Sequence, residues 1–200
     1  VWGKFVNAGQ TCIAPDFLIV KNNIKDKLIA ELLSEIKRAY GENPENSEDY
    51  PRIINKTNLS RLSNLIEGTN IVYGGEYNID TCYFSPTIID EPKIESPLMA
   101  EEIFGPILPV ISYDNENEIE KLILKYEKPL ALYVFSTNNK FSEKIIRKYS
   151  FGGGAIIDTI IHCGNPNLPF GGVGHSGIGA YHGKASFDLL THKKSIIKKG

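Results

Sequence analysis

The sequence predicts an α/β fold in which a mostly parallel sheet is flanked by helices. Along the 200 residues, apolar positions alternate between helical spacing and short extended runs, and this alternation is typical of parallel sheets with packed helices. Two extended runs, Leu130 to Phe135 and Ala155 to Ile157, are apolar throughout, as expected for strands covered on both faces. No internal repeat or low-complexity segment interrupts this order.

The helices are predicted from apolar spacing and from the residues that end it. The first runs from about Ile24 to Tyr40 and ends at Gly41, and the second ends near Gly68. A last helix is expected from about Tyr181 to Leu190. The apolar positions that define the helices between them are Leu59, Leu62, Leu65 and Ile66, then Ile119, Leu122 and Ile123, then Phe141, Ile145 and Ile146.

The remaining strands fall between these helices. Extended runs are expected at Phe17 to Val20, at Ile71 to Tyr73 and at Leu108 to Ser112. The segment from Gly41 to Pro51 is polar and contains Pro and Asn, which is typical of a surface loop.

Composition argues against several classes of partner. Hydrophobic residues make up 42% and charged residues 23%, which is ordinary for a soluble globular domain. The net charge of -2 gives no bulk attraction to nucleic acids or anionic membranes. A short basic tail, Lys193 to Lys199, is interpreted as a solvated end, and no apolar run reaches the roughly 18 residues of a membrane span.

Cysteines and histidines give no metal or disulfide signature. The three cysteines, Cys12, Cys82 and Cys163, include no C-x-x-C pair, and the four histidines lack metal-ligand spacing. We therefore expect no metal site, a reducing cytoplasmic location, and a free thiol at Cys12. Cys82 lies in an extended run and is expected to be inert, while Cys163 beside His162 gives only weak evidence for a reactive pair.

The first candidate site is the segment Phe5 to Pro15. A helix is expected to end near Gly9, and Pro15 prevents it from resuming, so Cys12 is placed on a turn. A thiol on a turn can face a cleft, and its reactivity needs access and nearby positive potential or backbone donors. Cys12 is therefore the candidate nucleophile.

A second candidate lies at Glu101 to Pro106, a turn that enters the strand at Leu108. A carboxylate here can accept two hydroxyl hydrogen bonds from a ribose, and Phe104 can pack on a flat ring. Taken alone the pattern is weak, because a carboxylate before a Gly-Pro turn is more often simply solvated.

The glycine-rich stretch Pro169 to Gly179 contains the pattern G-x-G-x-x-G at Gly172, Gly174 and Gly177. A dinucleotide fingerprint needs a strand before it and an acidic residue about twenty positions later. A Pro- and Asn-rich loop precedes this stretch, and Asp188 comes too early. We interpret the glycines as residues that let the backbone pass tightly round a pocket.

Together these segments resemble an aldehyde dehydrogenase. Phe5 to Cys12 resembles the catalytic cysteine motif of that family, and Glu102 to Pro106 resembles its second signature. The stretch from Asn165 to Lys184 is similar to the class 3 branch, which includes fatty aldehyde dehydrogenases. The resemblance covers about Val1 to Ile197, and three motifs in the correct order make it specific.

The resemblance implies the catalytic domain of an NAD(P)-dependent enzyme that oxidises aliphatic or aromatic aldehydes. Cys12 would attack the carbonyl carbon, the adduct would pass hydride to the nicotinamide, and the thioester would be hydrolysed. Glu102 would hold the nicotinamide ribose and Phe104 would pack near the ring. Phe170 would line the aldehyde pocket, with His162 close by.

The same resemblance places essential parts outside this sequence. In the family, the dinucleotide-binding domain, the general-base Glu and the oxyanion Asn all precede the cysteine. We therefore expect residues 1–190 to form the catalytic domain and residues 191–200 an oligomerisation segment, with no dehydrogenase turnover from this chain alone. Ile157 stands where many members have Asn, whereas the following Asp158 fits.

Two alternatives stay open. One is a thioester-forming variant that passes the acyl group to coenzyme A, which the class 3 character of Asn165 to Lys184 disfavours. The other is a non-catalytic domain that assembles or binds a partner. The terminal segment Lys193 to Lys199 resembles a strand that extends a sheet shared between subunits, which implies a homodimer.

Overall fold

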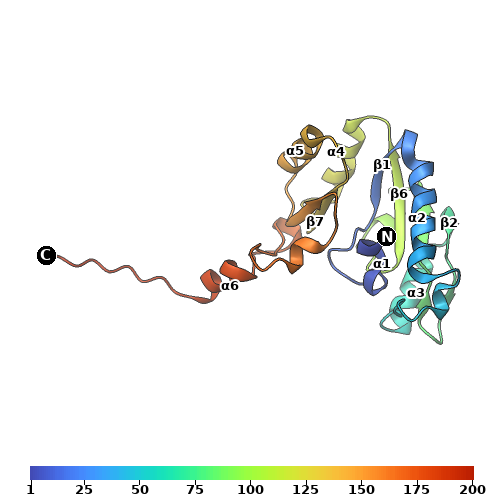
Figure 1. The fold of residues 1–200 in the computed structure, drawn as a ribbon, viewed down its shortest axis with the longest axis horizontal. Coiled ribbons are helices and arrows are strands. Elements are labelled where there is room, and N and C mark those ends of the chain that lie inside the picture. The colour runs from blue at the N-terminus through green and yellow to red at the C-terminus, as the bar shows by residue number, and fades with distance from the viewer. The chain divides into compact units, whose positions relative to one another are not determined.

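The computed structural model describes residues 1–200 and confirms the predicted α/β architecture with a mostly parallel sheet (Figure 1). The helices are α1 (Trp2–Phe5), α2 (Lys25–Tyr40), α3 (Lys56–Leu65), α4 (Glu116–Lys125), α5 (Asn139–Lys148) and α6 (Gly183–Leu190). The strands are β1 (Leu18–Lys21), β2 (Ile71–Tyr73), β3 (Tyr77–Asn78), β4 (Tyr83–Phe84), β5 (Thr87–Asp90), β6 (Ile107–Tyr113), β7 (Ala131–Val134) and β8 (Gly153–Ile156). The chain divides into two compact units, Val1–Leu122 and Ile123–Gly200.

The first unit is built on a four-stranded sheet in the order β1-β6-β5-β2. Strand β6 pairs in parallel with β1 and β5, whereas β2 is antiparallel to β5 at the edge. The sequence analysis missed β5, although it is central and its Thr87, Ile88 and Ile89 are buried. Four residues are too few to show a period, and Pro86 hides the start of the strand.

Helix α2 packs along this sheet (Figure 1). Leu32 and Ile36 contact a core that includes Ile88 and Val110 of the strands. Fully burying one such aliphatic side chain contributes roughly 1.5–3 kcal/mol. As predicted, the helix ends at Gly41, whose φ of 79° is readily adopted only by glycine.

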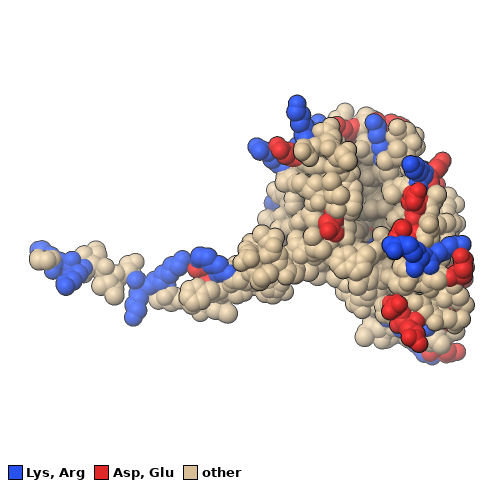
Figure 2. All heavy atoms as spheres, viewed as in Figure 1, with Lys and Arg blue, Asp and Glu red and all other residues tan.

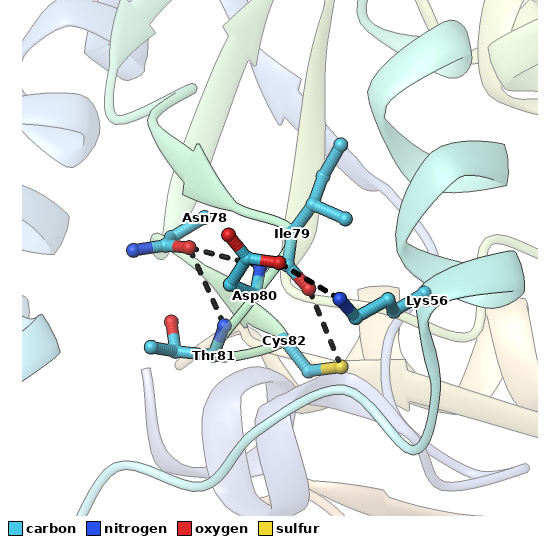
Figure 3. A network of polar contacts seen from close by, with 6 residues as sticks. All are labelled: Lys56, Asn78, Ile79, Asp80, Thr81 and Cys82. Atoms are coloured by element: carbon cyan, nitrogen blue, oxygen red, sulfur yellow. Dashed lines mark hydrogen bonds and ion pairs between the residues drawn. The ribbon is translucent and has the colours of Figure 1, made fainter.

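A tight turn joins β3 to β4 (Figure 3). The Asn78 side-chain oxygen accepts hydrogen bonds from the backbone N–H groups of Asp80 (3.0 Å) and Thr81 (3.3 Å). Lys56 of α3 reaches Asp80 at 2.8 Å. The expectation that Cys82 lies in an extended run is wrong, because Cys82 closes this turn with φ +53° and its Sγ donates to a backbone oxygen at 3.9 Å.

The second unit contains a two-stranded parallel sheet of β7 and β8. Val134 packs with Ile145 of α5 and with Tyr149 in a small core. The expectation that both strands are covered on both faces is wrong for this chain, because Ile156 of β8 is 45% exposed and β7 is only half-buried up to Tyr133. Apolar composition alone predicted burial, but helices of this unit cover only part of the small sheet.

Helix α6 is followed by an extended tail with many Lys side chains (Figure 2). Residues 192–200 form no helix or strand in the single chain, so the expected oligomerisation strand stays a prediction. None of the helices has the length and apolar character needed to cross a membrane.

Candidate active site

Cys12 is exposed on a turn, as the sequence predicts. The α-helix before it ends at Phe5, earlier than expected, and a 3₁₀ turn continues to Gly9. Asn7, Ala8 and Gly9 all have left-handed φ angles, of 53°, 51° and 71°. Left-handed geometry costs a residue such as alanine roughly 1–2 kcal/mol, so surrounding contacts must hold this turn in place.

Gln10 supplies much of that support. Its side-chain nitrogen donates to the backbone oxygens of Asn7 (3.0 Å) and Arg52 (3.1 Å), and its side-chain oxygen accepts from Ile54 N–H (2.9 Å). Asn7 donates in return to the Gln10 backbone oxygen at 2.9 Å. These bonds fasten the turn before Cys12 to a separate segment of the chain. The sequence analysis gave Gln10 no role, since its partners are distant in sequence.

The turn carrying Glu102 and Phe104 packs directly against the Cys12 segment. A Cβ atom added to Gly9 would lie 2.2 Å from the Gly105 backbone oxygen, so the two main chains touch. In addition, Ile103 N–H donates to the Asp16 carboxylate at 3.1 Å. The structure therefore brings into contact the two segments that carry Cys12, Glu102 and Phe104.

The turn from Glu102 to Phe104 is anchored by its buried central residue, whereas the residues on either side are exposed. Ile103 is 1% exposed and its backbone oxygen accepts from Arg61 of α3, whereas Phe104 is 42% exposed and has φ +46°. Glu102 is also exposed. Its pKa is raised by partial burial and then by the negative charge of Asp16, while Lys4 and Arg61 act in the opposite direction.

A buried charge lies beneath these residues. Lys4 is 2% exposed, its Nζ has no hydrogen-bond partner, and burial lowers its pKa to about 8 although Asp16 and Glu102 oppose the effect. Burial also raises the pKa of Asp16, against the attraction of Lys4. Sequence reasoning missed Lys4 because a four-residue helix shows no buried face, and it missed Asp16 because its partner Ile103 is distant in sequence. We call the following six residues the Cys12 cluster: Lys4, Gln10, Cys12, Asp16, Glu102 and Phe104.

The second unit contains an aromatic cluster, formed by Tyr133, His162, Phe170, Tyr181 and His182. The His162 ring centre lies 5.8 Å from that of Tyr133 and 6.1 Å from that of Phe170. His162 is 8% exposed, and neither ring nitrogen has a hydrogen-bond partner. Burial lowers its pKa. The two predicted pocket residues, His162 and Phe170, are thus neighbours.

The glycine-rich stretch folds back on itself next to this cluster. A Cβ atom on Gly171 would lie 2.2 Å from the Gly179 backbone oxygen, and one on Gly172 would lie 2.1 Å from that of Ser176. The next α-helix begins only at Gly183. A shallow pocket of about 270 Å³ nearby is lined by Cys163, Gly164, Asn165, Pro166, His182 and Gly183. The pattern G-x-G-x-x-G contains only a short 3₁₀ turn and opens no α-helix, in agreement with its interpretation as a loop.

The predicted residues therefore fall into two groups. Cys12, Glu102 and Phe104 belong to the first unit, and His162 and Phe170 belong to the second. No group of three or more His, Cys, Asp or Glu side chains is arranged to hold a metal ion.

Comparison with known proteins gives a consistent result. Residues 1–196 match the aldehyde dehydrogenase family. The chain is 48% identical over 200 residues to 4,4'-diaponeurosporen-aldehyde dehydrogenase of Staphylococcus aureus, covering 99% of this chain and 44% of the relative. It is 47% identical over 199 residues to aldehyde dehydrogenase family 3 member A2 of Rattus norvegicus, covering 100% of this chain and 41% of the relative.

A solved structure, the substrate-bound state of Staphylococcus aureus AldH, superposes with a TM-score of 0.93 at 45% identity. The match covers 100% of this chain and 45% of that one, so this chain spans less than half the length of these three relatives. The similarity to a family 3 member agrees with the class 3 resemblance of the sequence. The match over nearly all residues shows that this chain belongs to the aldehyde dehydrogenase family.

Proposed function

We propose that the protein containing this chain is an NAD(P)-dependent aldehyde dehydrogenase that oxidises aliphatic or aromatic aldehydes to carboxylic acids. One observation supports this most directly. The exposed Cys12 lies on a turn whose Gly9 packs against Gly105, at the end of the turn that carries Glu102 and Phe104. Packed main chain thereby holds a nucleophile and two candidate cofactor contacts in a defined geometry, which catalysis requires.

Cys12 is the proposed nucleophile. Its thiolate forms a bond to the aldehyde carbonyl carbon, and the carbonyl oxygen takes up the negative charge. The backbone N–H of Cys12 is the proposed donor to that oxygen. Loss of hydride from the same carbon leaves a thioester on Cys12, and water then releases the acid and regenerates the thiol.

The turn at Glu102 and Phe104 suits the nicotinamide end of the cofactor. Glu102 is an exposed carboxylate that can accept two ribose hydroxyl groups. Phe104 projects a partly exposed ring from a backbone fixed by the buried Ile103, and such a ring can pack against a flat heterocycle. When bound, NAD(P) supplies the acceptor for the hydride.

The aromatic cluster is the proposed aldehyde pocket. His162 and Phe170 offer ring surfaces, and burial favours the uncharged form of His162. Uncharged rings suit aliphatic or aromatic aldehydes better than substrates with a formal charge. This assignment rests on the geometry of the cluster and on the class 3 character of the surrounding stretch.

Residues 1–200 alone are expected to show no turnover. In the family, the dinucleotide-binding domain, the general base and the oxyanion amide come from residues before the cysteine. Without a positioned acceptor, hydride transfer lacks its second reactant.

The test is the absorbance of reduced cofactor with a panel of aldehydes and with NAD and NADP. The full-length protein is compared with residues 1–200, with Cys12→Ser and with the matched control Cys82→Ser. We expect activity only in the full-length protein and its Cys82→Ser variant, and a loss of about a thousandfold or more for Cys12→Ser. A Cys12→Ser variant with undiminished rate contradicts the assignment. Acyl-coenzyme A formed on addition of coenzyme A would indicate the acyl-transferring alternative.

A second candidate function, assembly through the C-terminal segment, has one observation in its favour. Leu190 is 83% exposed and Ile197 is 96% exposed, so apolar side chains lie uncovered at this end. A mouse relative, 45% identical over 98% of this chain and 43% of its own length, is named as a dimeric NADP-preferring aldehyde dehydrogenase. We propose that this protein forms a homodimer through residues 191–200.

Mass measurement in solution tests the dimer. Deleting residues 191–200 should give a monomer, and an unchanged dimer would place the interface elsewhere. Iodoacetamide labelling separates the catalytic from the purely structural interpretation. If Cys12 in a stable dimer reacts no faster than Cys82, the assembly function alone is favoured.

A further inference from the structure

Lys4 is a lysine whose side chain is almost completely buried. It is 2% exposed, and its buried Nζ has no hydrogen-bond partner. Lysine is almost never fully buried unless it is paired with an opposite charge. A buried ammonium group costs several kcal/mol of solvation, so the surroundings of Lys4 show what its charge acts on.

Two charged groups act on Lys4, namely Asp16, which follows Cys12, and Glu102 in the turn before β6. Arg61 of α3 acts on both of these carboxylates. Lys4 attracts both carboxylates, whereas the two carboxylates repel each other. Of the two cations that favour the charged form of Glu102, Lys4 has the larger effect and Arg61 the smaller.

Asp16 connects this charge cluster to the main chain of the candidate site. Its carboxylate accepts the N–H of Ile103, the residue directly after Glu102. Lys4 thus attracts the Glu102 carboxylate directly, while Asp16 holds the residue next to it. This attraction does not require Lys4 to touch a substrate or cofactor.

A role in stability alone does not account for Lys4. Burial outweighs both carboxylates and lowers the pKa of its ammonium group to about 8. An apolar side chain of similar length, such as methionine, would fill the same space without this penalty, and replacing buried charges in this way is often neutral or stabilising. The charge is therefore better explained by what it does to its neighbours.

We propose that Lys4 is a positioning residue that keeps the Glu102 carboxylate charged and in place to accept the ribose hydroxyl groups of NAD(P). This inference rests on the proposed function of Glu102. It assigns a task to a residue that never meets the cofactor, and it predicts that Lys4 and Asp16 act on Glu102 with opposite sign.

The experiment measures the dissociation constant of reduced cofactor for the full-length protein by nicotinamide fluorescence, across the acid and neutral pH range. Without Lys4, Glu102 takes up a proton at higher pH, so Lys4→Met should lose affinity earlier on acidification. In the acid range where Glu102 titrates, we expect Lys4→Met to bind the cofactor several-fold more weakly than the wild type. The difference should shrink as pH rises and vanish once Glu102 is ionised in both proteins.

Asp16→Asn should shift the pH profile of affinity in the opposite direction, and it remains informative if Lys4→Met fails to fold. Asparagine retains an oxygen to accept the Ile103 N–H but removes the charge that repels Glu102. The acid loss of affinity should therefore move to lower pH. If Asp16→Asn and Lys4→Met shift the profile in the same direction, the inference is wrong.

Two further variants distinguish an electrostatic from a structural effect. In a Glu102→Gln background, adding Lys4→Met should change affinity at no pH, because no carboxylate remains to be held. Lys56→Met is the matched control, since Lys56 is exposed and pairs with Asp80 elsewhere on the unit. A loss of affinity that is independent of pH, or that persists with Glu102→Gln, would overturn the proposal.

The readout also separates this inference from the proposed function. If the protein binds cofactor but oxidises no aldehyde, the proposed function fails while the binding profiles still decide the role of Lys4. If oxidation occurs and the profiles of Lys4→Met and the wild type coincide, only the inference on Lys4 fails.

Discussion

The Cys12 cluster and the aromatic cluster each contain a buried base without a hydrogen-bond partner, but they surround it differently. Lys4 is accompanied by Asp16 and Glu102, whose charges partly offset the burial that lowers its pKa. For His162 burial alone lowers the pKa, and its neighbours are the rings of Tyr133 and Phe170. The first arrangement maintains charge at neutral pH, which suits the proposed cofactor contact, whereas the second disfavours charge, which suits the proposed aldehyde pocket.

The largest effect on the Cys12 cluster is expected from disturbing the main-chain contact between Gly9 and Gly105. Gly9→Ala places a Cβ atom 2.2 Å from the Gly105 oxygen at a residue with φ +71°. We expect a loss of about 3 kcal/mol or more in unfolding free energy, together with loss of activity. Gly68→Ala is the matched control, since Gly68 has φ +68° and open space around it. It should cost only about 1 kcal/mol, and equal costs would show that the contact is unimportant.

Removing the buried charge should raise stability while impairing the site. The pKa of Lys4 is about 8 in the folded state against 10.5 for the free side chain, which corresponds to a penalty of about 3 kcal/mol at neutral pH. Between these values the unfolded chain binds more protons, so wild-type stability increases as pH rises from about 8 to 10.5.

Urea unfolding of the full-length protein measures this effect. Lys4→Met should be the more stable protein at neutral pH, and its advantage should disappear as the wild type gains stability in alkali. A Lys4→Met variant that is less stable than the wild type at neutral pH would show that the carboxylates outweigh burial.

The aromatic cluster should respond to acid rather than to alkali. The pKa of His162 is lowered below 6.5 by burial, so below pH 6.5 the unfolded chain takes up a proton that the folded chain does not. Stability is therefore lost as pH falls from 6.5 toward the folded pKa. His162→Leu should abolish this part of the acid sensitivity and gain about 1 kcal/mol near neutrality, since two unsatisfied nitrogens are removed.

Thermal unfolding across the acid range checks this expectation, with His175→Leu as the control because the His175 side chain is 81% exposed. If both variants keep the wild-type acid profile, His162 does not titrate in the way that its burial implies. A change in the KM for aldehydes in His162→Leu alone would support the pocket assignment.

The smallest effect is expected at a charge pair outside both clusters. Lys56 and Asp80 are 2.8 Å apart, with side chains 59% and 91% exposed (Figure 3). Solvent and salt screen such pairs. Asp80→Asn should leave stability and cofactor affinity unchanged within the error of a urea titration at physiological ionic strength. A measurable loss of stability or affinity would show that exposed charges in this unit matter as well as buried ones.

The secondary structure was largely predictable because local chemistry determines it. The period of apolar residues and the glycine at 41 located α2, and the same reasoning located α3, α4 and α5. Strand β5 could not be found this way, since its four residues owe their conformation to pairing with β6 on one side and β2 on the other. Likewise, apolar runs in β7 and β8 did not reveal how exposed those strands are.

The candidate site was predictable only in part. Cys12, Glu102 and Phe104 were proposed from their resemblance to family motifs, and the structure brings their segments into contact. The supporting residues Lys4 and Asp16 had no local signature, because their roles arise from contacts between segments that are far apart in sequence. Patterns along the chain can suggest candidate reactive groups. The charged groups that alter the pKa of those candidates can be identified only in the folded structure.

The contact between Gly9 and Gly105 also has an evolutionary consequence. A side chain at Gly9 would collide with the Gly105 main chain, and one at Gly105 would collide with Leu62 at 2.4 Å. We therefore expect the two segments to tolerate change only together. When chimaeras are assembled from divergent homologues, recombination points that exchange one segment without the other should yield few functional offspring, and those that transfer both should yield many.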